Sequence, residues 1–484
     1  MDQFMTFLTA LDNLVWGIPT CILIIGCGIW LTLRTRFLQV RHLGKALKYM
    51  FKNEADGAGE VSSFGALCTA LSATIGTGNI VGVATAIASG GPGALLWMEI
   101  AAFFGMATKY SEGLLALKYR TIDKDGHVLG GPFYYIERGM GKHWKWLAAL
   151  FAALGAGAGL LGIGTITQIN GITSAAQNFF DPAREHIVFT IGQGAGAVPI
   201  TWTTIIAGLL VTVFAALVII GGIKRIANVT QVVVPFMALT YISFAVILLL
   251  CNLPAIPHAF AAIITCAFAP QAAIGGVIGI TIKNAIQNGV ARGIFSNEAG
   301  LGSAAIAAAA AKTKNPVRQG LVTMTATFID TIVVCTMTGL AIVITDAWLP
   351  EHGLKGVEIT TYAFQTGLPF PSEISSFILM ICLVFFAFTT ILGWNYYGER
   401  CLEYLSHGNK KAVICYRWLY IAAVFIGPYL TVSAVWTIAD IFNALMALPN
   451  IIALLALSGV VAKETKQYFQ KDAQRELLRQ LKKR

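Results

Sequence analysis

Charged residues are scarce in this chain. Only 12% of its 484 residues are Asp, Glu, Lys or Arg, whereas about 25% is usual in soluble domains. Hydrophobic residues make up 56% of the sequence, the mean hydropathy is +0.70, and many apolar runs exceed the ~18 residues that read as a membrane span. These values exclude a soluble globular protein. They predict an all-α polytopic membrane protein with a single membrane domain.

The sequence also lacks the patterns of metal and catalytic sites. Its nine cysteines are scattered, with no C-x-x-C pair and no cluster with histidine, so we expect free thiols, no disulfide framework and no cofactor. No nucleophile–base arrangement is present, which argues against an enzyme. A receptor would have a soluble domain and a channel a continuous polar stripe, and neither is found. The net charge of +10 lies in loops, so we expect no nucleic-acid partner, and nothing indicates an obligate protein partner.

Hydropathy predicts eleven transmembrane helices. The predicted spans are 16–33, 62–88, 93–117, 147–178, 199–220, 229–252, 258–282, 320–345, 374–404, 412–431 and 435–462. The first is an extra N-terminal helix, and the other ten form a core. We therefore divide the chain into residues 1–60, a ten-helix core at 61–462 with halves at about 61–252 and 255–462, and a tail at 463–484.

Basic residues set the orientation of these spans. With eleven spans, every Lys- and Arg-rich loop falls on one side, whereas loops 179–198 and 346–373 are nearly free of them. Positive loops face the cytoplasm, so we expect the C-terminus inside, the N-terminus outside, and a bacterial cytoplasmic membrane. Segment 36–52 mixes apolar and basic residues at helical spacing, which predicts an interfacial helix on the inner leaflet. Segment 464–484 predicts a solvated helix.

Residues 76–79, Gly-Thr-Gly-Asn, interrupt the first core helix. Backbone that leaves a helix inside the membrane must be buried in protein or line a watery cavity. Freed N–H groups suit an anionic substrate group, and carbonyls around Ala73 and Gly76 suit a cation. The alternative is a small-residue packing face between helices. Because Gly-x-Gly-Asn is a poor helix and a poor lipid surface, we favour a binding site.

A second interruption is predicted at 270–276, where Pro and Gly break the helix that opens the second half. Two interrupted helices in corresponding positions indicate five-plus-five inverted repeats with a binding site at the midplane. The following segment, 283–312, is too polar to face lipid. We interpret it as packed cytoplasmic helices or a re-entrant hairpin that forms an inner gate, or else as a structural loop.

Five further residues are candidates for the site, each with an alternative. Thr389 and Thr390 offer hard oxygens to sodium, or bond to their own helix. Trp394, one turn further on, either forms the base of a substrate cavity or lies at the membrane interface. The Gln168 amide needs a partner, either a substrate or a neighbouring helix. Phe268 closes over a ligand or packs in the core.

Four acids lie in or near the predicted spans, and such groups are often functional or paired. They are Glu99, Glu112, Asp330 and Asp440. Glu112 lies close to Lys109 in sequence. The sequence leaves open whether these acids pair structurally or handle protons.

Several motifs resemble those of the sodium:alanine symporter family, the alanine or glycine:cation symporters. They are 75–80, 90–94 with Trp97-Met98, 105–109, 130–132, 295–300 and 393–399. The resemblance covers essentially the whole chain. Glu99 departs from the family pattern, where an aromatic residue is usual.

The resemblance implies a leucine-transporter-type five-plus-five inverted repeat with alternating access. It implies substrate binding by Thr77, Gly78, Asn79, Gln168, Phe268, Thr390 and Trp394. Sodium, the only metal ion expected, would bind between Ala73 and Gly76 on one helix and Thr389 and Thr390 on another. The expected function is sodium-coupled import of a small neutral amino acid, alanine or glycine. The alternatives are a proton-coupled carrier, with Glu99 or Asp330 titrating, or a preference for glutamine or serine.

Overall fold

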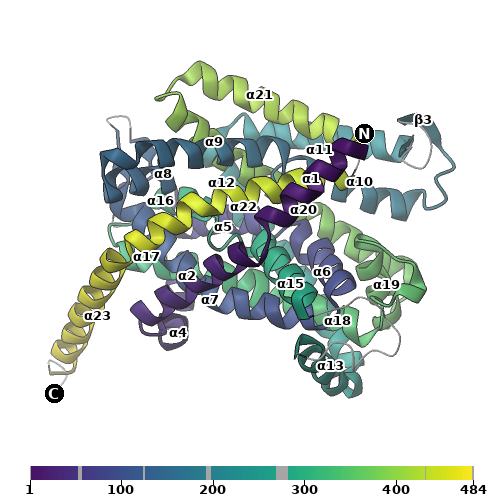
Figure 1. Cartoon of the computed structure of the whole chain (residues 1–484), viewed down its shortest axis with the longest axis horizontal. Coiled ribbons are helices and arrows are strands. Elements are labelled where there is room, and N and C mark those ends of the chain that lie inside the picture. The colour runs from purple at the N-terminus through teal and green to yellow at the C-terminus, as the bar shows by residue number, and fades with distance from the viewer. Residues whose placement is uncertain are drawn as a thin grey trace.

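The protein is described here by a computed structural model that covers residues 2–52, 57–123, 126–191, 198–268, 282–430 and 432–481. It is mostly helical (Figure 1). The helical class predicted from composition is thus confirmed. Within the described residues, strands form only two short antiparallel hairpins, β1–β2 and β3–β4.

The first half of the chain runs from the N-terminus to a long helix, α12. Its elements are α1 (Asp2–Val15), α2 (Ile18–Arg34), α3 (Leu38–Arg41), α4 (Leu43–Phe51), α5 (Ser63–Thr74), the π-helical turn Gly78–Gly82, α6 (Val83–Gly90), α7 (Gly93–Tyr119), β1 (Thr121–Ile122), β2 (Val128–Leu129), α8 (Pro132–Tyr135), α9 (Lys145–Leu161), α10 (Ile166–Phe180), β3 (Ile187–Ile191), β4 (Val198–Thr201), α11 (Trp202–Ile219) and α12 (Gly222–Cys251).

The second half begins with a shorter helix, α13. Its elements are α13 (Ile256–Phe268), α15 (Ile282–Asn297), α16 (Ser303–Ala309), α17 (Pro316–Thr327), the π-helical segment Phe328–Cys335, α18 (Thr336–Ile344), α19 (Val357–Gly367), α20 (Ser372–Leu405), α21 (Lys410–Ile426), α22 (Val432–Ala456) and α23 (Ser458–Leu481).

Seven helices of the described chain are long and apolar enough to cross a membrane, and eight if one bent pair is counted as a single span. The predicted total of eleven stays a prediction. One difference from the predicted spans concerns 147–178, which consists of α9 and α10 separated by a break at 162–165. Another is α1, an additional helix ahead of the predicted first span, which packs against α22.

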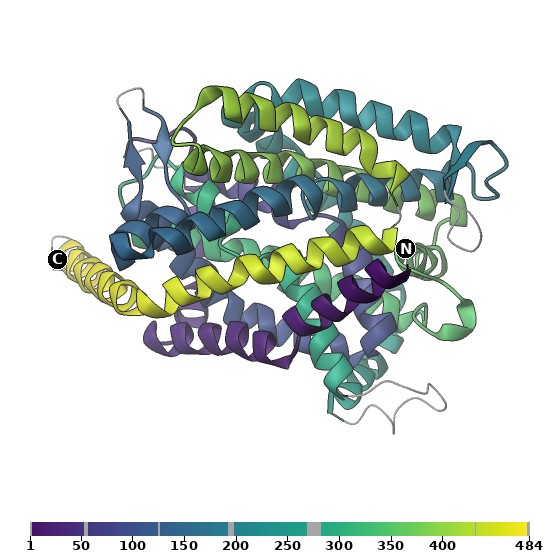
Figure 2. The ribbon, with the colours of Figure 1, turned by 45° about the horizontal axis from the view of Figure 1, so that its top comes forward.

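The two chain ends lie at opposite ends of the helix bundle (Figures 1 and 2). The C-terminal helix α23 projects from the end that also carries the β1–β2 hairpin, whereas the N-terminus lies near the β3–β4 hairpin (Figure 2). Opposite ends agree with an odd number of spans. Segment 36–52 forms the helices α3 and α4, and the tail forms α23, as their sequence patterns predict.

The first broken helix is the pair α5 and α6. Helix α5 ends at Thr74 and the chain resumes a helical path at Gly78, with the two parts bent by 48°. The interruption predicted at 76–79 is confirmed. Ser62 begins α5 by accepting a hydrogen bond from the Gly65 N–H, as N-cap serines do.

A second broken helix is formed by α15 and α16. The chain leaves the helix after Asn297, with positive φ angles at Glu298, Gly300 and Gly302, and re-enters it at Ser303. This segment, within 283–312, therefore consists mainly of packed helices and is not a structural loop, because α15 packs against α6 and α7 and α16 against α5 and α7. Its role as an inner gate stays a prediction. The interruption predicted at 270–276 lies outside the described residues.

The segment before α5 and the segment after α16 contact each other at the end of the molecule that carries the β1–β2 hairpin. The Glu60 N–H donates to the Ala310 carbonyl at 2.9 Å, and Val61 pairs with Ala311. The Arg120 guanidinium donates to the Ala309 carbonyl at the end of α16 and to the Ala58 carbonyl at 2.6 Å. A positive charge at the C-terminal end of a helix interacts favourably with the helix dipole, so Arg120 stabilises this arrangement.

Candidate functional site

The break at 75–77 is held by hydrogen bonds from side chains. The Gly76 N–H donates to Asn79 Oδ1 at 2.9 Å, and the Thr77 N–H donates to Gln168 Oε1 at 3.2 Å. Gln168 is itself fixed, because its Nε2 donates to the Ile163 carbonyl at 2.9 Å in the break between α9 and α10. Two neutral amides thus replace the backbone acceptors that an unbroken helix would supply.

Asn79 also connects the first break to a buried carboxylate. Its Nδ2 donates to Asp330 Oδ1 at 2.8 Å. The other oxygen of Asp330 accepts from Ser296 Oγ at 2.9 Å and from Thr331 Oγ1 at 2.7 Å. All four side chains are fully buried. A buried carboxyl group, with hydrogen-bond donors on both of its oxygens, thus lies directly beside the unwound segment.

Helix α20 lies against the other side of the break. Thr390 Oγ1 donates to the Ile75 carbonyl at 3.3 Å and to the Phe386 carbonyl of its own helix at 3.0 Å. Thr389 bonds only within α20 and to the Met237 sulfur. Ala73 touches α20 closely, since a Cβ placed on Gly393 would lie 2.8 Å from the Ala73 nitrogen.

The glycines of the break are required by close packing. A Cβ on Gly76 would collide with the Thr390 hydroxyl, and one on Gly78 would lie 3.0 Å from the Ser296 Cα and 3.3 Å from a ring carbon of Phe295. Thr77 reaches the other wall, packing on Gly171 of α10. The break is therefore enclosed by α10, α15 and α20, with no exposed atom on Thr77 or Asn79.

Two predicted residues lie apart from these hydrogen bonds. Phe268 is 56% exposed at the end of α13 and makes an edge contact with Trp97, whereas the aromatic ring that abuts Gly78 belongs to Phe295. Trp394 is fully buried one turn beyond Thr390, against Gly164, with its indole near Glu298. The structure thus gathers Ala73, Gly76, Thr77, Gly78, Asn79, Gln168 and Thr390, with Trp394 adjacent.

The second break is held by a carboxylate. Glu112 Oε1 accepts hydrogen bonds from the Gly300 and Gly302 N–H groups, both at 3.1 Å, and from Asn450 Nδ2 at 2.8 Å. The remaining oxygen of Glu112 has no hydrogen-bond partner among the described residues. A charged acceptor with three donors binds more strongly than a neutral amide does.

A buried ion pair lies at the start of the same break. Lys109 Nζ is 3.9 Å from Glu298 Oε2, and both side chains are fully buried. Glu298 also accepts from Ser303 Oγ at 2.6 Å. Glu298 has a φ of +57°, a left-handed conformation uncommon for residues other than glycine. Removal of either partner would leave the other as a buried charge that has lost its ion-pair partner.

The comparison with known proteins agrees with this architecture. The profile of the family described as "Sodium:alanine symporter family" matches residues 1–482. A transporter of Haemophilus influenzae is 53% identical over 467 residues, covering 96% of each chain. The sodium/alanine symporter AgcS of Methanococcus maripaludis is 46% identical, covering 96% of this chain and 97% of its own. The probable sodium/glutamine symporter GlnT of Bacillus subtilis is 36% identical, covering 97% and 92%.

The chain belongs to the sodium:alanine symporter family. Its relatives are transporters, so the protein is a multi-pass membrane transporter and not an enzyme. The family implies sodium and amino acids as the transported species. The resemblance drawn from the sequence motifs is thereby confirmed.

Sequence reasoning did not assign roles to Phe295, Ser296 or Thr331, which adjoin the first break. Phe295 and Ser296 belong to the motif 295–300, which also contains Gly300. That glycine-containing motif within a polar segment is a local signal from which the second break could have been found, although we used it only for the family resemblance. Thr331 carries no such signal, because a threonine beside an aspartate in an apolar helix usually bonds locally.

Proposed function

We propose that the protein is a sodium-coupled symporter that imports a small neutral amino acid, alanine or glycine, across the bacterial cytoplasmic membrane by alternating access. The observation that carries this proposal is the enclosed break at 75–77, whose backbone N–H groups are occupied by Gln168 and Asn79. A substrate carboxylate is a stronger acceptor than either amide. It would take over these donors when it enters.

The proposed substrate site consists of Thr77, Gly78, Asn79, Gln168, Thr390 and Trp394, with Phe268 as a predicted wall residue. Phe295 is the better candidate for that wall, since a Cβ placed on Gly78 would lie only 3.3 Å from its ring. Thr77 Oγ1 is buried and has no hydrogen-bond partner among the described residues, so it is free to donate to a carboxylate. The tight packing of Gly78 against Ser296 favours a small substrate side chain.

The proposed sodium site lies between Ala73 and Gly76 on one side and Thr389 and Thr390 on the other. The Ile75 carbonyl and Thr390 Oγ1, which are 3.3 Å apart, offer the hard oxygen ligands that sodium prefers. A cation there would hold α5 and α20 together. Sodium binding would thus order the break and complete the substrate site, so that coupling arises from a shared conformational cost.

The membrane potential makes such coupling effective. Each sodium ion that moves inward gains about 2.3 kcal/mol per 100 mV, in addition to its concentration gradient. One ion is therefore sufficient for a substantial gradient of a neutral passenger.

The direct test is uptake of labelled alanine into proteoliposomes. The proposal expects accumulation with an inward sodium gradient and little uptake with potassium in its place. Equal uptake in both would reject sodium coupling. Thermal stabilisation by each of the twenty amino acids, in sodium and in potassium, would identify the substrate.

A proton-coupled carrier is the second candidate. Glu99 and Asp330 are deeply buried and close enough to interact electrostatically, and buried acids in membrane helices often relay protons. Uptake driven by an inward pH gradient in the absence of sodium would favour this candidate. A glutamine preference is a further alternative within the family, and the same amino-acid panel tests it.

A further inference from the structure

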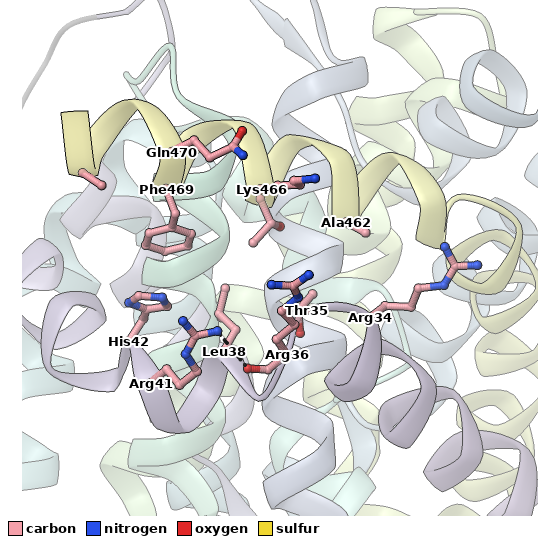
Figure 3. Close-up of a pocket in the computed structure, with 12 residues that line it drawn as sticks. Arg34, Thr35, Arg36, Leu38, Arg41, His42, Ala462, Lys466, Phe469 and Gln470 are labelled. Carbon is pink, nitrogen blue, oxygen red and sulfur yellow. Dashed lines mark hydrogen bonds between the residues drawn. The ribbon is translucent and has the colours of Figure 1, made fainter. Parts of the chain in front are cut away.

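A basic cleft opens where the apolar helix α2 ends. It has a volume of about 450 Å³ and is walled by the end of α2, by α3 and by α23. Figure 3 shows α23 lying across this cleft from the residues that end α2 and form α3, with Phe469 pointing toward His42. Four of its lining residues carry a positive charge: Arg34, Arg36, Arg41 and Lys466.

The four cations have no carboxylate partner within the described part of the chain. The two nearby acids of α23 are used elsewhere: Glu464 pairs with Lys118 at 2.7 Å, and Asp472 pairs with Lys45. Unpaired like charges repel one another. A bound anion would relieve this repulsion, so the four positive charges favour an anionic ligand in the cleft.

The walls of the cleft are fixed by other contacts. Tyr110 and Thr465 hydroxyls lie 2.7 Å apart and join α23 to α7, and the Tyr49 and Tyr468 hydroxyls, also 2.7 Å apart, join it to α4. The His42 ring stacks on Phe469 with a centroid distance of 3.8 Å. Burial, followed by the charges of Arg41 and Lys45, lowers the pKa of His42, so this ring forms a neutral edge of the cleft.

The chain turns abruptly at the mouth of the cleft. Arg36 and Phe37 have φ values of +58° and +54°, a left-handed conformation that is rare for bulky residues and that tends to occur at ligand clamps. The turn separates the two side chains: Arg36 lines the cleft, whereas Phe37 is 45% exposed.

Exposed apolar side chains place the cleft at the level of the lipid. Leu33, Phe37 and Val40 are 55%, 45% and 61% exposed and flank the basic residues in sequence. Trp30, also exposed, lies under the Arg34 guanidinium at 4.8 Å, an arrangement typical of the membrane interface. A soluble anion would leave these apolar side chains exposed to water, whereas the acyl chains of a lipid would cover them.

We propose that this cleft binds the headgroup of an anionic phospholipid of the inner leaflet. The phosphate would lie among Arg34, Arg36 and Lys466, and the acyl chains would pack along the exposed face of α2 and α3. Basic pockets between membrane helices on the cytoplasmic side suit such headgroups. The lipid would join the extra N-terminal helix to α23, and this role does not depend on which amino acid is transported.

The test is native mass spectrometry of the full-length protein titrated with phosphatidylglycerol or with phosphatidylethanolamine. We expect one phosphatidylglycerol to bind more tightly than phosphatidylethanolamine. The double variant Arg34→Gln/Arg36→Gln should weaken phosphatidylglycerol binding about 25-fold, since each basic residue near the surface contributes about fivefold. Arg34→Lys/Arg36→Lys, which keeps the charges, should retain most of the affinity and shows whether the segment still folds.

The control is Lys410→Gln/Lys411→Gln, the same change in charge at exposed positions that begin α21. It should leave lipid binding unchanged. Equal binding of the two lipids, or an unchanged affinity in the Arg34→Gln/Arg36→Gln variant, would overturn the proposal. Displacement of the lipid by millimolar glycerol phosphate would also overturn it, because the cleft would then be a site for soluble phosphate.

Discussion

The two broken helices differ in what satisfies their backbones. At the first break, neutral amides of Gln168 and Asn79 accept from the Thr77 and Gly76 N–H groups. At the second break, the Glu112 carboxylate accepts from Gly300 and Gly302. Neutral hydrogen bonds are individually weak and exchangeable, whereas a charged acceptor with three donors is costly to remove.

This difference assigns distinct roles to the two breaks. At the first break, a bound substrate can replace the amide acceptors of the backbone N–H groups, which suits a binding site that empties and is reoccupied in each transport cycle. The second is fixed by Glu112 and by the ion pair between Lys109 and Glu298, which suits a rigid support. Ser296 hydrogen-bonds to Asp330 and packs closely on Gly78. It therefore connects the two breaks, so that the second break would position the proposed binding site.

The largest expected effect concerns the buried ion pair. Lys109→Met or Glu298→Gln alone should lower the free energy of unfolding by about 3–5 kcal/mol, because each leaves one buried charge without its partner. The double variant should be destabilised by much less than the sum of the two single variants. Chemical and thermal unfolding of the purified protein would measure these differences.

Helix α7 offers a matched control for that pair. Lys118 and Glu464 form an ion pair at 2.7 Å with both side chains partly exposed. Lys118→Met/Glu464→Gln should change the free energy of unfolding by only about 0–1 kcal/mol. Similar losses in the buried and the exposed pair would remove the contrast between a rigid second break and its surroundings.

The next effect concerns binding at the first break. Asn79→Ala should weaken amino-acid binding by about 1–3 kcal/mol, because the Gly76 N–H and Asp330 Oδ1 lose the partner that Asn79 supplies. Stability should fall less than in the Lys109 and Glu298 variants. Thr85→Ala is the control, since the Thr85 hydroxyl bonds only to the Val81 carbonyl of its own helix. Calorimetric titration with alanine in sodium would show normal affinity in Asn79→Ala if the assignment is wrong.

A smaller effect is expected for the cation. Thr390→Val removes one hydroxyl ligand and should raise the sodium concentration for half-maximal uptake by about two- to tenfold, equivalent to about 0.5–1.5 kcal/mol. Thr212→Val, whose parent hydroxyl bonds to the Gly208 carbonyl of its own helix at 2.7 Å, should leave the sodium dependence unchanged. An equal shift in both variants would indicate a general effect on helix packing.

The smallest effect concerns His127 in the β1–β2 hairpin, which lies beside Glu60 and Glu403. Hydrogen bonds to Glu403 and then to Glu60 raise the pKa of His127 to about 9. The stabilisation is complete below the unfolded pKa of about 6.5 and is lost as the pH rises through about 9. Because His127 is partly exposed, we expect about 1 kcal/mol at most.

His127→Gln should therefore flatten the fall in the thermal midpoint between about pH 6.5 and pH 9. A wild-type midpoint that rises over this range would contradict the assignment of His127 as the protonated partner of Glu60 and Glu403. The control is His143→Gln, because His143 is an exposed residue in a different loop.

The sequence was informative where the signal is local. Glycine and asparagine at 76–79 marked the first break, and the isolated amide at 168 marked a partner for it. The fold class and the helices of segments 36–52 and 464–481 likewise follow from composition and periodicity. Each of these features can be predicted from residues that are close together in the sequence.

The second break was not identifiable in the same way. Its supports, Lys109 and Glu112, are about 190 residues from Gly300 in the sequence, and polar residues of α15 such as Arg292 resemble those of a loop. Arg292 is paired with Asp440 at 2.6 Å, a pairing invisible to hydropathy. Phe295 carries no role in the sequence-based prediction for the same reason, whereas Phe268, just before the stretch 270–276, enters it through the family resemblance.

Hydrogen–deuterium exchange of the two breaks tests the central claim most directly. We predict that alanine with sodium slows exchange in peptides that contain residues 75–79, because the passenger satisfies and orders that backbone, and leaves peptides that contain residues 298–302 unchanged. Unchanged exchange at 75–79 together with strong protection at 298–302 would contradict the account and would place the passenger at the second break.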